Sequence, residues 1–187
     1  MPAARPHDPC QGGGRPNQDL MYSRFYAAAD EDFRSPACRR LIAYWRDKAA
    51  GRRRPDWTAL NLMDVYDIAP MIMVRDVLDR GREYRCRFCG TRLVETLGVD
   101  PTGKLLADTY SPEGQNLMHE RYGLVLKVDA PVRLSGYLRV VEKNVPTGYE
   151  GVLLPLGDGK GALGHIILVL DLGHDPATEG ILPTPAL

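Results

Sequence analysis

The chain has 187 residues, of which 44% are hydrophobic, and its 24 basic residues balance 24 acidic ones. Zero net charge argues against a nucleic-acid-binding protein, and no apolar run reaches the roughly 20 residues that a membrane-spanning helix needs. The sequence lacks the pattern of a secretory signal peptide, so we expect a cytoplasmic protein with one folded domain that needs no disulfide or metal.

The first segment, residues 1–34, is predicted to be disordered or weakly helical. Prolines at positions 2, 6, 9 and 16 and three consecutive glycines leave its first part with almost nothing to bury. Residues 21–33 have only a weak helical pattern. We therefore expect the folded part of the chain to begin at about Ser35.

An amphipathic helix is predicted within residues 35–55. Ser35 and Pro36 suit the N-cap and the first helical position, and Gly51 and Pro55 suit its end. One face carries apolar residues at helical spacing: Cys38, Leu41, Ile42, Trp45 and Ala49. This face must be covered, either by the outer face of a sheet or by the same helix of a second subunit.

Residues 56–172 are predicted to form one α+β domain. Strands are expected at residues 71–78, 84–89, 131–142, 149–156 and 162–172, and helices at residues 91–97 and 112–128. Thr91 is the expected N-cap of the first helix and Gly98 its C-cap. Because the helices separate the second strand from the third, we predict a five-stranded antiparallel sheet with helices on one face. Residues 173–187 are expected to be a loose tail.

Alternation in two of these strands gives each strand two different faces. One face is apolar and includes Tyr84, Cys86, Phe88, Leu134 and Val140. The opposite face carries Arg85, Arg87, Arg133, Tyr137 and Arg139. Two interpretations of the arginine-bearing face stay open. It is either plain surface or helix-covered, or it binds a partner or an anionic ligand such as a bacterial nucleotide second messenger.

Several stretches resemble the PAS domain family, and in particular small stand-alone bacterial PAS proteins with an N-terminal amphipathic helix. They are Ala43-Tyr44-Trp45-Arg46, Ile68-Ala69-Pro70-Met71-Ile72, Tyr84 to Thr91, Leu97 to Lys104, and Leu153 to Gly159. The resemblance extends from about Ser35 to Leu172. It implies a sensory or regulatory module, often dimeric, with room for a ligand cavity between sheet and helices. It implies no active site.

Two functional hypotheses follow from this resemblance. The first is a non-enzymatic regulatory module that acts on an unidentified signalling protein, or as a homodimer, and is gated by a small ligand. Its interface candidates are Leu41, Ile42, Trp45, Arg87, Tyr137 and Arg139, because the apolar helix face would otherwise be an exposed patch. The second is a receptor with an occupied core pocket. Its candidate lining residues are Tyr84, Cys86, Leu93, Leu97, Leu117, Arg121, Val125 and Leu134.

The C-x-x-C motif of Cys86 and Cys89 suggests zinc or redox chemistry. However, three residues along a strand span ~10 Å and place the two thiols on opposite faces, whereas a disulfide needs Cβ atoms about 3.8 Å apart. The sequence offers no second pair for a zinc site. We therefore expect structural cysteines, no metal site and no catalytic residues.

Cofactors of PAS relatives are not expected either. Cys86-Arg87-Phe88 resembles the cysteine motif of flavin-binding relatives, but it lies on a strand and lacks their flanking Asn and Gln. His119 lies on the long helix where haem-binding relatives carry their axial ligand, but it is offset from the apolar stripe. The letters G-x-G-x-x-G at Gly159, Gly161 and Gly164 are flanked by strands, so they indicate a hairpin turn and not a dinucleotide site.

Overall fold

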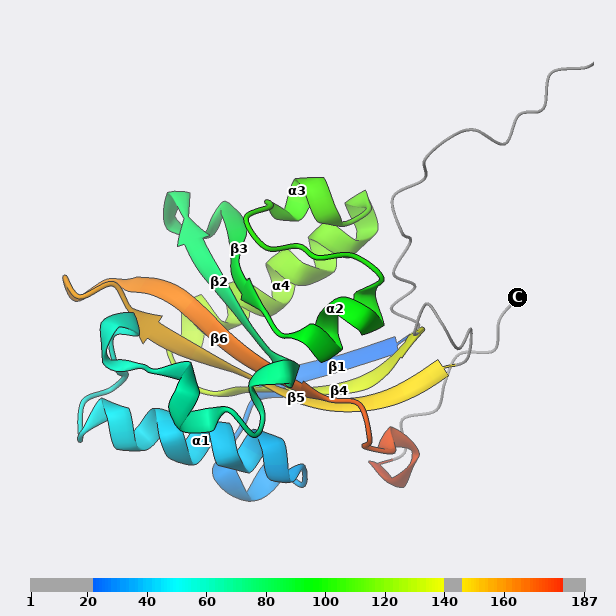
Figure 1. The fold of residues 1–187 in the computed structure, drawn as a ribbon, viewed down its shortest axis with the longest axis horizontal. Coiled ribbons are helices and arrows are strands. Elements are labelled where there is room, and N and C mark those ends of the chain that lie inside the picture. Colours follow the sequence, from blue (N-terminus) through cyan, green and yellow to red (C-terminus); the bar gives the residue numbers. More distant parts are fainter. Residues whose placement is uncertain (1–21, 140–145, 180–187) are drawn as a thin grey trace, which may run out of the picture.

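The computed structural model describes residues 22–139 and 146–179 (Figure 1). The strands are β1 (Tyr22–Ala27), β2 (Ile72–Leu78), β3 (Glu83–Cys89), β4 (Val132–Arg139), β5 (Pro146–Gly157) and β6 (Leu163–Asp171). The helices are α1 (Pro36–Ala49), α2 (Thr91–Leu97), α3 (Leu106–Thr109) and α4 (Pro112–Val128). Short 3₁₀ turns are η1 (Asp30–Asp32), η2 (Trp57–Ala59), η3 (Leu62–Val65), η4 (Ala69–Met71), η5 (Asp79–Gly81) and η6 (Pro176–Glu179). The predicted α+β class is confirmed.

All described strands form one antiparallel sheet in the order β1-β4-β5-β6-β2-β3. The consecutive strands β4, β5 and β6 are neighbours, and the β2–β3 hairpin lies beside β6. Figure 1 shows α1 on one face of this sheet and α2, α3 and α4 on the other. We call the α1 side the outer face and the opposite side the inner face.

The sheet has one strand more than predicted, because residues 22–27 form the edge strand β1. The sequence alone predicts disorder or a weak helix for this segment. It pairs with β4 and alternates as a strand should: Phe25 packs on the inner core, and the Tyr26 hydroxyl accepts a hydrogen bond from Arg133 at 3.2 Å. The remaining predicted disorder, in residues 1–21, lies outside the described residues, as does Val140.

The tail and the start of one strand also differ from the sequence expectations. Pro176 is buried, and the Tyr137 hydroxyl donates to Asp175 Oδ1 at 3.2 Å, so residues 173–179 pack on the sheet and are not loose. Residues 146–148, which precede the predicted strand 149–156, already belong to β5. Residues 180–187 of the predicted tail lie outside the described residues.

Helix α1 covers the outer face, as the amphipathic pattern allowed. Leu41, Ile42 and Trp45 are only 0%, 3% and 6% exposed, and they pack with Val74, Val152, Leu154, Ile167 and Val169 of the sheet. Trp45 Nε1 donates to the backbone oxygen of Pro155 at 2.7 Å. These three side chains are therefore core residues of a single chain, which corrects their assignment as interface candidates. The exposed apolar patch that motivated the dimer prediction does not exist.

Helix boundaries follow their capping residues with one exception. The side chains of Ser35 and Ser111 accept hydrogen bonds from Cys38 N and Gly114 N, as N-caps do. In α2 the N-cap position is taken by Gly90 and not by Thr91. A Cβ on Gly90 would lie 2.3 Å from the backbone oxygen of Ala69, so only glycine allows this close approach to η4.

Strand β3 contains a β-bulge that changes which side chains share a face. Val74 pairs with Phe88 and Arg75 with Cys86, which leaves Arg87 as the extra residue. Phe88 therefore packs with the outer core, and Cys89 joins Cys86 on the inner face. Both sequence expectations, an inner Phe88 and thiols on opposite faces, are wrong because they assumed an unbroken period of two.

Candidate ligand cavity

A cavity of about 60 Å³ lies between the inner face of the sheet and helices α2 and α4. It is lined by Met73, Leu93, Thr96, Leu97, Tyr110, Met118, Arg121, Tyr122, Leu134, Leu138, Leu153, Leu168 and Leu170. Since one water occupies roughly 10–15 Å³ by the same measure, the cavity has room for about four to six water-sized positions. Its wall is mainly aliphatic and aromatic, and Arg121 contributes its charged group.

Of the predicted pocket residues, Leu93, Leu97, Arg121 and Leu134 line this cavity. The others, Tyr84, Cys86, Leu117 and Val125, belong to the inner core or pack against it, but they are not lining residues. Near Tyr84 the space is filled by aromatic rings, because the ring centroids of Tyr122 and His119 lie 4.8 Å and 5.5 Å from that of Tyr84. The pocket is thus shifted from the predicted position toward the Met73 end of β2.

The polar side chains of the wall belong to Thr96 of α2, to the segment before α4 and to α4 itself. Arg121 is 4% exposed, and its Nη2 donates to the Tyr149 hydroxyl at 2.9 Å. Tyr110 precedes α4 and Tyr122 lies within it. Sequence reasoning missed both tyrosines: Tyr110 lies outside any periodic segment, and Tyr122 lies beside the predicted apolar stripe of α4.

Arg75 lies directly behind this wall. Its side chain is fully buried, with an exposed fraction of 0%, and its Nη2 donates to the Tyr110 hydroxyl at 3.2 Å. Its Nε and Nη1 atoms have no hydrogen-bond partner, and no carboxylate among the described residues forms an ion pair with it. A buried charge without a partner is costly, so this arginine is the least satisfied polar group near the cavity.

Tyr110 does not supply the missing negative charge. Burial raises the pKa of Tyr110 to about 12, even though Arg75 acts in the opposite direction. The phenol is therefore neutral near pH 7 and interacts with Arg75 as a hydrogen-bond acceptor and through its ring, whose centroid lies 5.8 Å from the guanidinium carbon.

Cys86 is the cross-strand partner of Arg75 on β3, and Cys89 lies on the same face. A hydrogen bond between the two thiols lowers the pKa of Cys86; burial opposes this, and the charge of Arg75 adds to the lowering. The same hydrogen bond, together with burial, raises the pKa of Cys89. Both cysteines are free, and within residues 22–139 and 146–179 no three His, Cys, Asp or Glu side chains are grouped as a metal site would require.

Haem and flavin do not fit this cavity. A space for about four to six waters is far smaller than a porphyrin or an isoalloxazine ring. His119 is half-buried, packs its ring against Tyr84 and is not a lining residue. Cys86 is likewise not a lining residue of the cavity, and the charge of Arg75 acts on its thiol.

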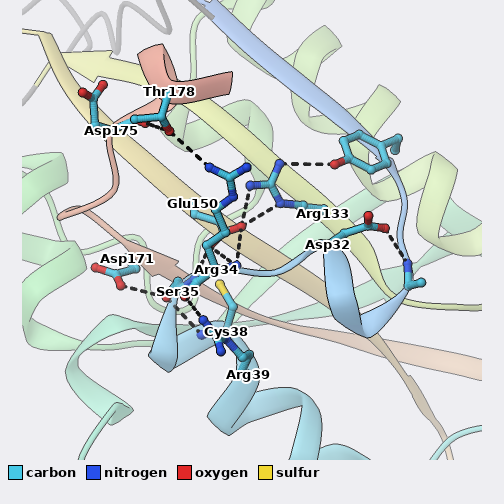
Figure 2. A network of polar contacts seen from close by, with 12 residues as sticks. Asp32, Arg34, Ser35, Cys38, Arg39, Arg133, Glu150, Asp171, Asp175 and Thr178 are labelled. Carbon is cyan, nitrogen blue, oxygen red and sulfur yellow. Dashed lines mark hydrogen bonds and ion pairs between the residues drawn. The ribbon is translucent and has the colours of Figure 1, made fainter. Parts of the chain in front are cut away.

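On the outer face, Arg133 is part of a buried polar network (Figure 2). Its Nη2 lies 2.6 Å from Glu150 Oε1, and the two side chains are 2% and 0% exposed. Glu150 also accepts hydrogen bonds from the backbone N–H groups of Arg34 and Ser35, and Ser35 Oγ donates to Asp171. Arg133 is therefore neither plain surface nor available to an anionic ligand. It joins the start of α1 to the sheet.

Arg85 and Arg87 of this face lie beside Asp76, which is 5% exposed. Arg85, Arg87 and His165 Nδ1 all contact its carboxylate. Burial raises the pKa of Asp76, but hydrogen bonds from Arg87, His165 and Arg85 outweigh burial and hold that pKa below its usual value. Of the remaining interface candidates, Tyr137 is buried, and the side chain of Arg139 lies outside the described side chains.

No helix within the described part of the chain is both long and apolar enough to cross a membrane.

Among the comparisons with known proteins, a family model covers most of the chain. The family model of the PAS domain matches residues 33–169. Among solved structures, the PAS domain of BvgS from Bordetella pertussis is 21% identical, with a TM-score of 0.45, covering 64% of this chain and 92% of that chain. An RNA-binding light-oxygen-voltage receptor is 14% identical, with a TM-score of 0.45, covering 81% of this chain and 38% of that chain. No curated protein matches. Since the family model spans more than half of the sequence, the chain belongs to the PAS domain family of sensory and regulatory modules.

Proposed function

We propose that this PAS domain is a non-enzymatic sensory module that binds a small molecule in the inner-face cavity and transmits binding to another protein. The cavity is the observation that carries the proposal. Protein interiors are normally packed to the density of organic crystals, so a void of about 60 Å³ with a buried guanidinium on its wall is not a routine packing defect.

The receptor hypothesis is better supported than docking without a ligand. The sequence suggests docking of a partner protein because α1 has an apolar face that must be covered. In the structure, that face packs on the chain's own sheet. A homodimer stays a prediction without that support. By contrast, the cavity combines an apolar lining with a few polar groups, as small-molecule sites commonly do.

A route from the cavity to the surface supports the transmission step. Helix α2 contributes Leu93 and Leu97 to the wall and packs on η4, which in turn contacts η3. Met63 lies within η3 and Tyr66 directly follows it, and they are 73% and 72% exposed. A ligand that displaces α2 would move this apolar pair, which is suited to contact a partner protein.

A thermal-shift screen of small metabolites tests the proposal. We expect at least one compound to raise the unfolding midpoint of the wild type and not that of Leu97→Phe, in which the larger ring fills the cavity. Leu62→Phe is the matched control, because Leu62 is also half-buried but packs on the outer core. It should keep the response. The absence of any shift across the panel, with no small molecule retained in native mass spectra, would contradict the proposal.

A further inference from the structure

The chemical class of the ligand can be inferred from Arg75, and this step rests on the proposed function. Arg75 is a fully buried cation whose Nε and Nη1 atoms are unpartnered. The buried carboxylates of the described residues, Asp76 and Glu150, both lie on the outer face with cationic partners of their own. The inner face therefore lacks an anion for Arg75 within the described part of the chain.

Tyr110 connects this arginine to the cavity. Its hydroxyl oxygen accepts the hydrogen bond from Arg75 Nη2, and Tyr110 is itself a lining residue of the cavity. A hydroxyl that accepts one hydrogen bond still has its own proton to donate. No acceptor for that proton lies among the described residues. An anion in the cavity would accept it, and the charge of Arg75 would strengthen this hydrogen bond.

A second guanidinium lies on the same wall. Arg121 is a lining residue of the cavity, and its Nη2 donates to the Tyr149 hydroxyl at 2.9 Å. The rest of the lining is mainly leucine and methionine, which offers an apolar surface and few hydrogen-bond donors. This combination suits a molecule with one anionic group and a short hydrocarbon part. It does not suit phosphate, whose several oxygens would be left without donors.

We propose that the cavity binds a short-chain monocarboxylate, about the size of propionate. Its carboxylate contacts Tyr110 and Arg121, and it is the counter-charge of Arg75. Room for about four to six water-sized positions matches a molecule of this size. A nucleotide second messenger is much larger than this cavity in the unliganded structure.

Calorimetric titration with sodium propionate tests this assignment, with propionamide as an uncharged probe of nearly the same shape. Wild-type protein should bind propionate and not propionamide. Arg75→Met should weaken propionate binding at least tenfold without lowering the unfolding midpoint of the unliganded protein. Arg85→Met is the matched control, because Arg85 is exposed on the outer face, and it should bind propionate as the wild type does.

Tyr110→Phe provides a second variant that keeps Arg75 and the ring. Loss of the hydroxyl should weaken propionate binding about tenfold, as expected for one hydrogen bond to a charged group. If Arg75→Met fails to fold, the same comparison with Tyr110→Phe decides the question. Equal propionate affinity in Tyr110→Phe and the wild type would overturn the proposal.

The remaining outcomes separate the two proposals. Binding of propionamide without binding of propionate would overturn the monocarboxylate assignment and leave the sensory function intact. If neither probe binds and Leu97→Phe responds to the metabolite screen as the wild type does, both the sensory proposal and the monocarboxylate proposal are contradicted.

A third outcome concerns Cys86 as the counter-charge of Arg75. Fast alkylation of Cys86 by iodoacetamide at neutral pH, slowed by Arg75→Met and unaffected by propionate, would overturn the assignment in favour of a thiolate.

Discussion

On the outer face of the sheet, the buried guanidinium of Arg133 lies 2.6 Å from a carboxylate oxygen of Glu150, whereas the buried guanidinium of Arg75 on the inner face meets the neutral phenol of Tyr110. The two faces also differ in how completely they are packed. The outer face is closed by α1, while the inner face retains a cavity of about 60 Å³. The comparison indicates that buried charge on the outer face serves the fold; for the inner face, our proposal assigns the buried charge of Arg75 to ligand binding.

The largest effect is expected from breaking the buried pair of the outer face. Arg133→Met leaves Glu150 buried without its cation, so the free energy of unfolding should fall by about 3–5 kcal/mol. Urea denaturation measures this loss. Arg85→Met is the control, because a 47% exposed side chain in an ion pair should cost about 1 kcal/mol or less. Similar losses for the two variants would contradict a special role of Arg133.

Truncation of the α1 face should also destabilise the single chain. Leu41→Ala removes a fully buried side chain from the outer core, with an expected loss of about 2–5 kcal/mol. Sedimentation velocity should find the same oligomeric state as for the wild type. Dissociation of a dimer by this substitution, with little change in unfolding free energy, would instead restore Leu41 to an interface.

The inner-face arginine should behave in the opposite way to Arg133. Arg75→Met removes a buried charge that has no ion-pair partner among the described residues. The unliganded protein should therefore be unchanged or more stable by about 1–3 kcal/mol. Urea denaturation in ligand-free buffer gives the sign directly. A loss as large as that of Arg133→Met would mean that Arg75 has a structural partner, and the contrast between the two faces would fail.

The smallest effect concerns acid sensitivity at Asp76. Its folded pKa is held below the usual value, so its ionised form contributes stability that is present above about pH 4 and is lost as pH falls through the folded value. Asp76→Asn should cost about 1–2 kcal/mol at pH 7 and less than that below pH 4. Urea midpoints over this pH range test it. A constant difference between variant and wild type would rule out the carboxylate as the cause.

Much of the fold could be predicted from local patterns. Ser35 and Ser111 cap the helices that follow them, and strict alternation located β4 on the sheet. The edge strand β1 could not be predicted, because Phe25 and Tyr26 gain their packing only from β4 and Arg133. The bulge at Arg87 is equally invisible to a pattern of period two.

The cavity was predicted in outline but not in its chemistry. Each face of strand β2 carries one charged residue among apolar ones, so the sequence does not reveal which of Arg75 and Asp76 finds a counter-ion. The answer depends on β3 and β6, which bring Arg85, Arg87 and His165 to Asp76 and none of them to Arg75. Tyr110 lies in an irregular segment and gave no periodic signal.

Both faces can be observed in a single NMR titration with sodium propionate. The indole N–H of Trp45 is buried on the outer face at Pro155, and the Nε–H groups of Arg75 and Arg121 report on the inner face. We expect saturable shifts of the two arginine signals and an unmoved Trp45 signal. Arginine signals that stay unmoved at saturating propionate, or shifts confined to the outer face, would contradict a ligand site on the inner face.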